Sequence, residues 1–234
     1  MKLEVVLESF EDLLLASKQN IDRIELVSAL DLGGLSPSLA LVNQFYIIPE
    51  LNLQIMIRPR PGGFTYSNFE IHVMNEEIKM MADQGVRGVV FGCLDDKLNI
   101  DEKTTEKLFS TASSLGLETT FNRAFDFCKD QDRAIIFLTD LGFNRILSAG
   151  STSSIDTGYK KLEQLLQKTE NKIGVIAAGG INEKNIIPLL GMELESIHFS
   201  IRKPKKNEVN DYAGLGNEYN SDIDKLNTIC QLTQ

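Results

Sequence analysis

The sequence is poor in residues that cross-link a fold or bind soft metal ions. Its 234 residues include three cysteines, two histidines and no tryptophan. The cysteines are widely spaced, so they form neither a disulfide framework nor a CxxC zinc motif. We therefore expect a reduced, cytoplasmic protein rather than a secreted, disulfide-bonded one.

Positive charge and long apolar runs are also scarce. The net charge of −9 argues against a general grip on a phosphate backbone, so we expect no nucleic acid as partner. The longest apolar runs, such as AIIFL at 134–138, are too short to cross a bilayer. Glutamates at positions 4 and 8 interrupt the apolar core that a signal peptide would need. We expect no membrane association.

Short runs rich in Val, Ile and Leu alternate with longer segments of helical period. Because strand–helix–strand crossovers give parallel pairing, this alternation predicts a parallel sheet. A doubly wound open sheet is an alternative, but eight regular units favour a single (β/α)8 TIM barrel formed by residues 1–234 as one domain. The eight strand-like runs lie at 3–8, 22–27, 53–58, 87–92, 118–122, 144–149, 173–178 and 195–200.

Local signals mark two helix starts and one long loop. Ser9, followed by Asp12, resembles a capping box at the start of the first helix. Ser36 and the proline after it predict the start of the second helix. Residues 201–218 are long enough for a functional loop over the barrel mouth.

Polar residues gather where strands are expected to end. In TFNRAFD (120–126), Asn122, Arg123 and Asp126 follow a buried strand. The C-terminal ends of barrel strands carry the reacting groups of TIM-barrel enzymes, which makes these residues catalytic candidates. Burying unpaired charge is costly, so convergence of such groups favours a site over charges that merely pair to hold the barrel. The other candidates on strands are Glu25, Arg58 and His198.

A glycine pair after the seventh strand predicts an anion-binding site. In AAGGI (177–181), Gly179 and Gly180 allow backbone N–H groups to approach an anion, and Ser200 ends the eighth strand. The alternative is a tight turn in which glycine only relieves strain. In the binding hypothesis, Arg58 and Arg123 clamp a phosphate or carboxylate, and Glu25 or Asp126 acts as acid or base.

Cys93 and Cys128 follow adjacent predicted strands, where two thiolates would suit copper(I). The alternative is that both are small buried hydrophobic residues. Cys230 falls on the apolar stripe of the last helix, and His72 lies on a polar helix face.

Several stretches together resemble the CutC family of copper homeostasis proteins. The resemblance runs in order along nearly the whole chain and implies a cytoplasmic TIM barrel that self-associates and is linked to copper, with copper(I) as the expected metal. The stretches are DRIELVSALDLGGLSPS (22–38), IRPRPGGFTYS (57–67), FNRAFD (121–126), ILSAG (146–150), AAGGI (177–181) and SIHFS (196–200).

Two departures from the family pattern remove groups that a copper site would use. The family reads FHRAFD where this chain has Asn122, and many members carry cysteines where it has Val6 and Leu7. Three functions therefore remain open. They are copper(I) handling through Cys93 and Cys128, binding or conversion of a small phosphorylated or carboxylated metabolite, and a scaffold without chemistry.

Overall fold

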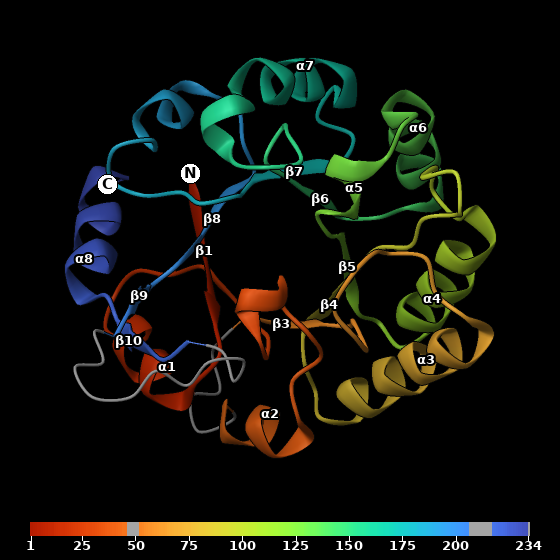
Figure 1. The fold of residues 1–234 in the computed structure, drawn as a ribbon, viewed down its shortest axis with the longest axis horizontal. Coiled ribbons are helices and arrows are strands. Elements are labelled where there is room, and N and C mark those ends of the chain that lie inside the picture. Colours follow the sequence, from red (N-terminus) through yellow and green to blue (C-terminus); the bar gives the residue numbers. More distant parts are fainter. Residues whose placement is uncertain (46–51, 206–216, 234) are drawn as a thin grey trace.

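The chain forms a closed, eight-stranded parallel barrel surrounded by helices (Figure 1). The computed structural model describes residues 1–45, 52–205 and 217–233. Neighbouring strands follow chain order around the barrel, so the predicted TIM barrel is confirmed. The strands are β1 (Lys2–Leu7), β2 (Arg23–Leu26), β3 (Leu53–Met56), β4 (Gly88–Phe91), β5 (Glu118–Phe121), β6 (Arg145–Ser148), β7 (Gly174–Ala177) and β8 (Ser196–Ser200).

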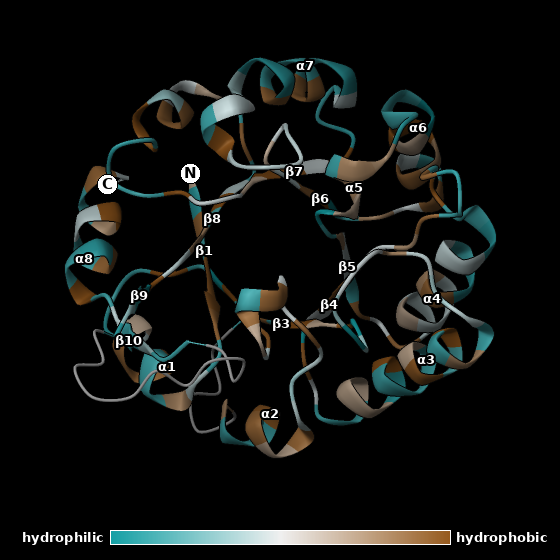
Figure 2. Ribbon diagram, viewed as in Figure 1, coloured by the Kyte–Doolittle hydropathy of each residue, from teal (hydrophilic) through white to brown (hydrophobic). Residues whose placement is uncertain are grey.

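The outer layer consists of helices that alternate hydrophobic and hydrophilic residues along their length (Figure 2). This pattern is typical of helices with one face against a sheet. None of the helices in the described ranges has the length and apolar character needed to cross a membrane. The helices are α1 (Phe10–Ala16), α2 (Leu39–Phe45), α3 (Asn68–Asp83), α4 (Glu102–Ser114), α5 (Ala124–Phe127), α6 (Gln131–Leu141), α7 (Tyr159–Thr169) and α8 (Ile223–Leu232), with 3-10 helices η1 (Leu30–Leu32), η2 (Ile155–Thr157) and η3 (Ile187–Gly191).

Two of the expected helices differ from the prediction. Between β7 and β8 the described chain forms the short η3, whose first turn contains a proline that donates no backbone hydrogen bond. The predicted start of α2 at Ser36 is wrong, because the Ser36 Oγ accepts a hydrogen bond from the Arg58 N–H at 2.8 Å. The Ser38 Oγ accepts instead from the Leu41 N–H at 3.2 Å. The predicted cap at Ser9 is confirmed by a 3.1 Å bond from the Asp12 N–H.

Alternation along each strand separates two apolar layers. Residues such as Val5 and Ile24 belong to the large core beneath the helices. Their neighbours point inward and form two smaller clusters in the upper barrel, so that the interior near the C-terminal ends is walled by apolar side chains. One cluster contains Val6, Val27, Met56 and Val90, and the other contains Leu147, Ile176 and Ala178.

Charged side chains occupy the lower part of the barrel interior. Arg23, which is 3% exposed, forms an ion pair with Glu4 and donates from Nη2 to Glu195 and Ser196, each at 2.7 Å. Across the barrel, a similar pair joins Arg145 to Glu118 at 2.6 Å. These charged residues therefore pair with one another inside the barrel, which is the alternative to a functional site considered from the sequence.

The segment after β8 begins and ends with a small antiparallel ribbon. Strand β9 (Arg202–Pro204) pairs with β10 (Tyr219–Ser221). The Arg202 guanidinium lies 4.1 Å from the centre of the Tyr219 ring, whose hydroxyl donates to Asp31 at 2.7 Å. Of the predicted 201–218 loop, residues 206–216 lie outside the described residues.

Glu195→Gln is expected to lower stability at pH 7 by roughly 2 kcal/mol and to flatten the acid dependence of unfolding. Burial alone would raise the pKa of Glu195, but the hydrogen bond and charge of Arg23 outweigh it and lower the pKa to about 2. A carboxylate with a depressed pKa stabilises the fold above its ordinary pKa of 4.5, and that contribution is lost as the pH falls toward 2.

Urea unfolding at several pH values from 7 to 2.5 would measure this change. Glu170→Gln is the matched control, because Glu170 pairs with Lys172 on the surface and should change nothing measurable. An acid dependence equal in the Glu195 variant and the unaltered protein would contradict the prediction.

Candidate functional site

A cavity of about 260 Å³ opens at the C-terminal ends of the barrel strands. Side chains of both inner apolar clusters form much of its wall. Seven of the residues singled out from the sequence line it, and they come from β2, β5, β7 and β8 or the loops that follow these strands. They are Glu25, Asn122, Arg123, Gly179, Gly180, His198 and Ser200.

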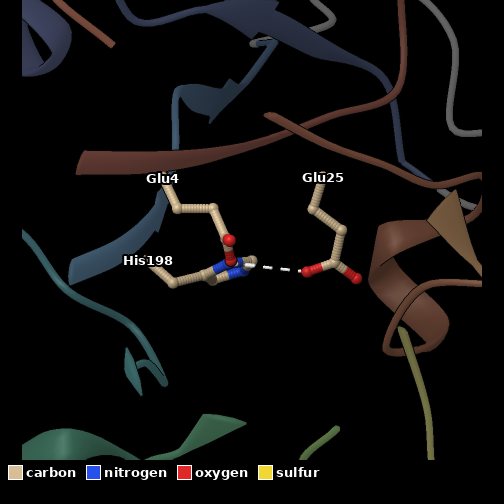
Figure 3. A group of neighbouring side chains, drawn as sticks. All are labelled: Glu4, Glu25 and His198. Atoms are coloured by element: carbon tan, nitrogen blue, oxygen red, sulfur yellow. Dashed lines mark hydrogen bonds and ion pairs between the residues drawn. The ribbon is translucent and has the colours of Figure 1, made fainter. Parts of the chain in front are cut away.

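Glu25 and His198 lie on either side of β1, which contributes Glu4 between them (Figure 3). Glu4 stands opposite His198 in the register of β1 with β8. The His198 Nδ1 lies 2.6 Å from the Glu4 Oε1 and 3.5 Å from the Glu25 Oε2. Both buried carboxyl groups therefore approach the same imidazole nitrogen.

The two carboxyl groups differ in their ionisation. Burial raises the pKa of Glu25 to about 7; the charge of His198 opposes this rise and the charge of Glu4 adds to it. Burial would also raise the pKa of Glu4, but His198 and Arg23 lower it to about 2. For His198, the carboxylates outweigh burial and raise the pKa. At neutral pH, Glu4 is thus ionised, whereas Glu25 is close to its midpoint.

The rim after β7 presents free backbone donors. Gly179 and Gly180 have φ angles of 93° and 81°, which favour glycine, and a Cβ at Gly179 would lie 2.6 Å from the Ala149 Cβ. The carbonyl of Gly179 accepts a hydrogen bond from the Ile155 N–H at 2.9 Å. By contrast, the N–H groups of both glycines donate to no described residue. Such donors on a cavity wall suit an anion.

Asn122 and Arg123 are held by local contacts at the end of β5. The Asn122 Oδ1 accepts from the Ala124 N–H at 2.9 Å, and a Cβ on Gly92 would lie 2.3 Å from that oxygen. Gly92 therefore makes room for the amide. The Arg123 Nε donates to Asp126 at 2.8 Å, and its Nη2 donates to the Ser151 carbonyl at 3.1 Å.

The structure corrects the predicted role of Arg58 as an anion clamp. Its Nη1 donates to the carbonyls of Leu32 at 2.7 Å and Gly34 at 3.0 Å, and its Nη2 donates to that of Gly62 at 2.6 Å. Arg58 is 4% exposed and does not line the cavity. It joins two loops whose carbonyl groups would otherwise lack partners.

Asp126, predicted as an acid or base, also lies behind the cavity wall. Its side chain is fully buried and accepts hydrogen bonds from the Ser148 Oγ at 2.6 Å and the Ala149 N–H at 3.0 Å. Through these bonds and its ion pair with Arg123, the Asp126 carboxylate holds the loop after β5 against β6. Its role is therefore structural.

The cysteines do not provide a site that fits copper(I). Cys93 and Cys128 belong to the apolar core and do not line the cavity. Burial raises the pKa of both thiols, whereas the thiolate is the form that binds metals. In the part of the chain that the structure describes, metal-binding side chains gather instead at Glu4, Glu25 and His198.

Two charged residues in or next to the cavity were absent from the site predicted from the sequence: Glu4 and Arg202. Alternation along β1 points Glu4 and Glu8 to the same side, which is the only sequence signal for Glu4. Its partner depends on the register of β1 with β8, which brings together residues 194 positions apart. Arg202 lines the cavity because β9 begins directly beyond β8.

The model of the CutC family matches residues 1–203. This chain belongs to the CutC family. A CutC family protein of Glaesserella parasuis is 40% identical over 203 residues, which are 86% of this chain and 83% of the relative. Another, from Treponema denticola, is 37% identical over 209 residues, or 88% of this chain and 83% of the relative.

Solved structures agree with this membership. The crystal structure of CutC from Streptococcus agalactiae matches with a TM-score of 0.78 at 30% identity, covering 85% of this chain and 98% of that one. A 3-hexulose-6-phosphate synthase from Salmonella typhimurium matches with a TM-score of 0.60 at 16% identity, covering 100% and 98%. The second likeness shows the shared barrel fold alone.

Arg58→Ala is expected to destabilise the protein by about 2–4 kcal/mol, because it leaves buried carbonyl groups without donors. Chemical denaturation would measure the loss. Arg60→Ala is a matched control from the same loop, where the arginine is more exposed and a smaller loss is expected. A stable Arg58 variant that had lost anion binding would restore the clamp hypothesis.

Proposed function

We propose that this protein binds a small phosphorylated or carboxylated metabolite at the C-terminal mouth of its barrel. The observation that best supports this proposal is the pair of N–H groups at Gly179 and Gly180 on the cavity wall, which have no partner among the described residues. Ser200, at the end of β8, adds a hydroxyl group to the same wall. Loops after the seventh and eighth strands commonly bind phosphate in TIM barrels.

The arginines of the cavity add limited positive charge. Arg123 is paired with Asp126, and Arg202 is paired with Glu8 at 3.2 Å and Asp31 at 2.7 Å. Backbone and hydroxyl donors would therefore supply most of the binding energy. We expect an affinity that depends weakly on salt, because short hydrogen bonds are screened less than exposed charges.

The size and lining of the cavity restrict the ligand body. A volume of about 260 Å³ admits a small molecule, and Val27, Met56 and Leu147 suit a short apolar segment. Glu25 and His198 offer polar groups to the rest of the ligand. An acid or base role for Glu25 stays a prediction.

Ser200→Ala is expected to weaken binding of the best anion by roughly tenfold or more, since a hydrogen bond to a charged group contributes about 1.5–3 kcal/mol. Thermal shifts with a panel of phosphorylated and carboxylated metabolites, in the presence of EDTA, would identify that anion. Arg123→Ala should also weaken its binding, through loss of charge and of loop support.

The matched control is Arg133→Ala. Arg133 pairs with Glu102 on the surface, with 68% of its side chain exposed, and it does not line the cavity. Stabilisation by anions that is equal in the control and the two cavity variants would place the anion elsewhere. No response to any anion would remove the proposal.

Family membership supports copper homeostasis as a second candidate. CutC of Streptococcus agalactiae bears the name of a proposed copper homeostasis protein. In this chain the thiols that follow strands of the barrel are those of Cys93 and Cys128, after β4 and β5. Their burial and raised pKa values oppose copper(I) binding, so this candidate has less support from the residues.

Copper(I) handling through these thiols predicts stoichiometric binding in an anaerobic titration that Cys128→Ser abolishes. Cys230→Ser is the matched control, because Cys230 is buried in α8. Binding that survives in the Cys128 variant would exclude this site.

The family resemblance also supports two further proposals, a cytosolic location and self-association. Cell fractionation would test the first. Light scattering coupled to size-exclusion chromatography would test the second, and a monomer at micromolar concentration would contradict it.

A further inference from the structure

The cluster formed by Glu4, Glu25 and His198 has the arrangement of a metal site without soft ligands. One potential ligand atom from each residue lies within 4.8 Å of the others. The residues come from β1, β2 and β8, whose backbones are fixed by parallel pairing, so the donors are held by rigid elements. In Figure 3 the carboxyl group of Glu4 overlaps the imidazole of His198, and Glu25 points toward the ring from the right.

One oxygen of this cluster lacks a partner. The Glu25 Oε1 is buried and makes no hydrogen bond with any described residue, although Glu25 is only 1% exposed. A buried carboxylate oxygen without a partner is costly, and most such atoms in folded proteins are paired. The missing partner is a positively charged or hydrogen-bonding group that fits beside Glu25 and His198.

The nearest charged partner of Glu25 is His198, whose Nδ1 lies 3.5 Å from the Glu25 Oε2 and is shared with Glu4. The other nearby cation, Arg23, forms ion pairs with Glu4 and Glu195. Glu4 and Glu25 thus converge on one nitrogen of His198. A divalent cation that replaced the imidazole proton would be a common partner for both carboxylates. Arg23 would then orient Glu4 as an outer hydrogen-bond partner, in the way that second-shell groups orient metal ligands.

The donor set decides which cation fits. One imidazole nitrogen and two carboxylate oxygens suit divalent ions such as Zn²⁺, whereas copper(I) prefers thiolate and thioether sulfur. The cavity gives the ion a route from the mouth, because Glu25 and His198 both line it.

We propose that Glu4, Glu25 and His198 bind one divalent cation of the zinc class at the base of the cavity. The copper(I) that the family name implies does not fit these ligands. The cation site is independent of the anion-binding proposal, since the anion would be held by Gly179, Gly180 and Ser200.

Calorimetric titration with Zn²⁺ in phosphate-free buffer tests this site, with Co²⁺ as a spectroscopic probe of the ligands. We expect one ion per chain and an absorption spectrum of nitrogen and oxygen ligation without thiolate bands. Glu25→Gln keeps the side-chain shape but removes the charge. It should weaken Zn²⁺ binding by about tenfold or more, because loss of even an outer hydrogen-bond partner of a ligand has an effect of that size. His198→Gln should do the same.

Two matched variants separate this site from others. His72→Gln removes the exposed second histidine of the chain, and Cys128→Ser removes a thiol; both should bind Zn²⁺ as tightly as the unaltered protein. Glu25→Gln is expected to fold, because it replaces a buried carboxyl group that has one unpaired oxygen by a neutral group of the same shape, and thermal unfolding would verify this. If His198→Gln does not fold, the Glu25→Gln variant alone decides the test.

Three results would overturn the proposal. They are no Zn²⁺ binding by the unaltered protein, full binding by a folded Glu25→Gln variant, and loss of binding in the His72 or Cys128 variant. Displacement of Co²⁺ by copper(I) under anaerobic conditions would overturn the assigned class of ion. Anion binding is measured with EDTA present, so a failure of the cation site leaves that measurement unaffected, and the converse also holds.

Discussion

The buried ion pair between Arg23 and Glu4 is the contact on which the barrel interior depends. Each residue is 3% exposed or less, so both charges have lost most of their hydration. Such a pair is tolerated only when further hydrogen bonds satisfy both groups, and removing one partner leaves an uncompensated charge. Glu195 and Ser196 satisfy Arg23, while His198 satisfies Glu4. The orientation of the imidazole is therefore a consequence of charge pairing in the lower barrel.

This network gives the interior two unlike regions. Below, the charges of β1, β2 and β8 are mutually paired; above, the apolar clusters wall the cavity. Low polarity strengthens electrostatic interactions and makes an unpaired group more costly. Glu25 lies at the boundary and is buried like the lower residues, but one of its oxygens has no partner among the described residues. Its position explains why one carboxyl group can be open to a ligand while its neighbour serves the fold.

Much of the fold was predictable because it rests on local patterns. Alternation placed Glu25 inside the barrel, and the order of apolar runs gave eight strands in parallel. Side-chain partners were not predictable in this way. The guanidinium of Arg58 turns toward backbone carbonyls of two loops, and Asp126 turns toward β6, because these groups would otherwise be buried unpaired. No pattern of residue types reports which carbonyls a fold leaves unsatisfied.

The stacking of Arg202 on Tyr219 joins the region that the family model matches to the chain beyond it. The family match ends at residue 203, directly after Arg202, and Tyr219 lies beyond it. Tyr219 is in turn fixed by Asp31, next to the loop after β2. One wall of the cavity is thus braced by a residue beyond the region that the family model matches. Changes to this C-terminal ribbon would therefore alter that wall without disturbing the charged base of the barrel.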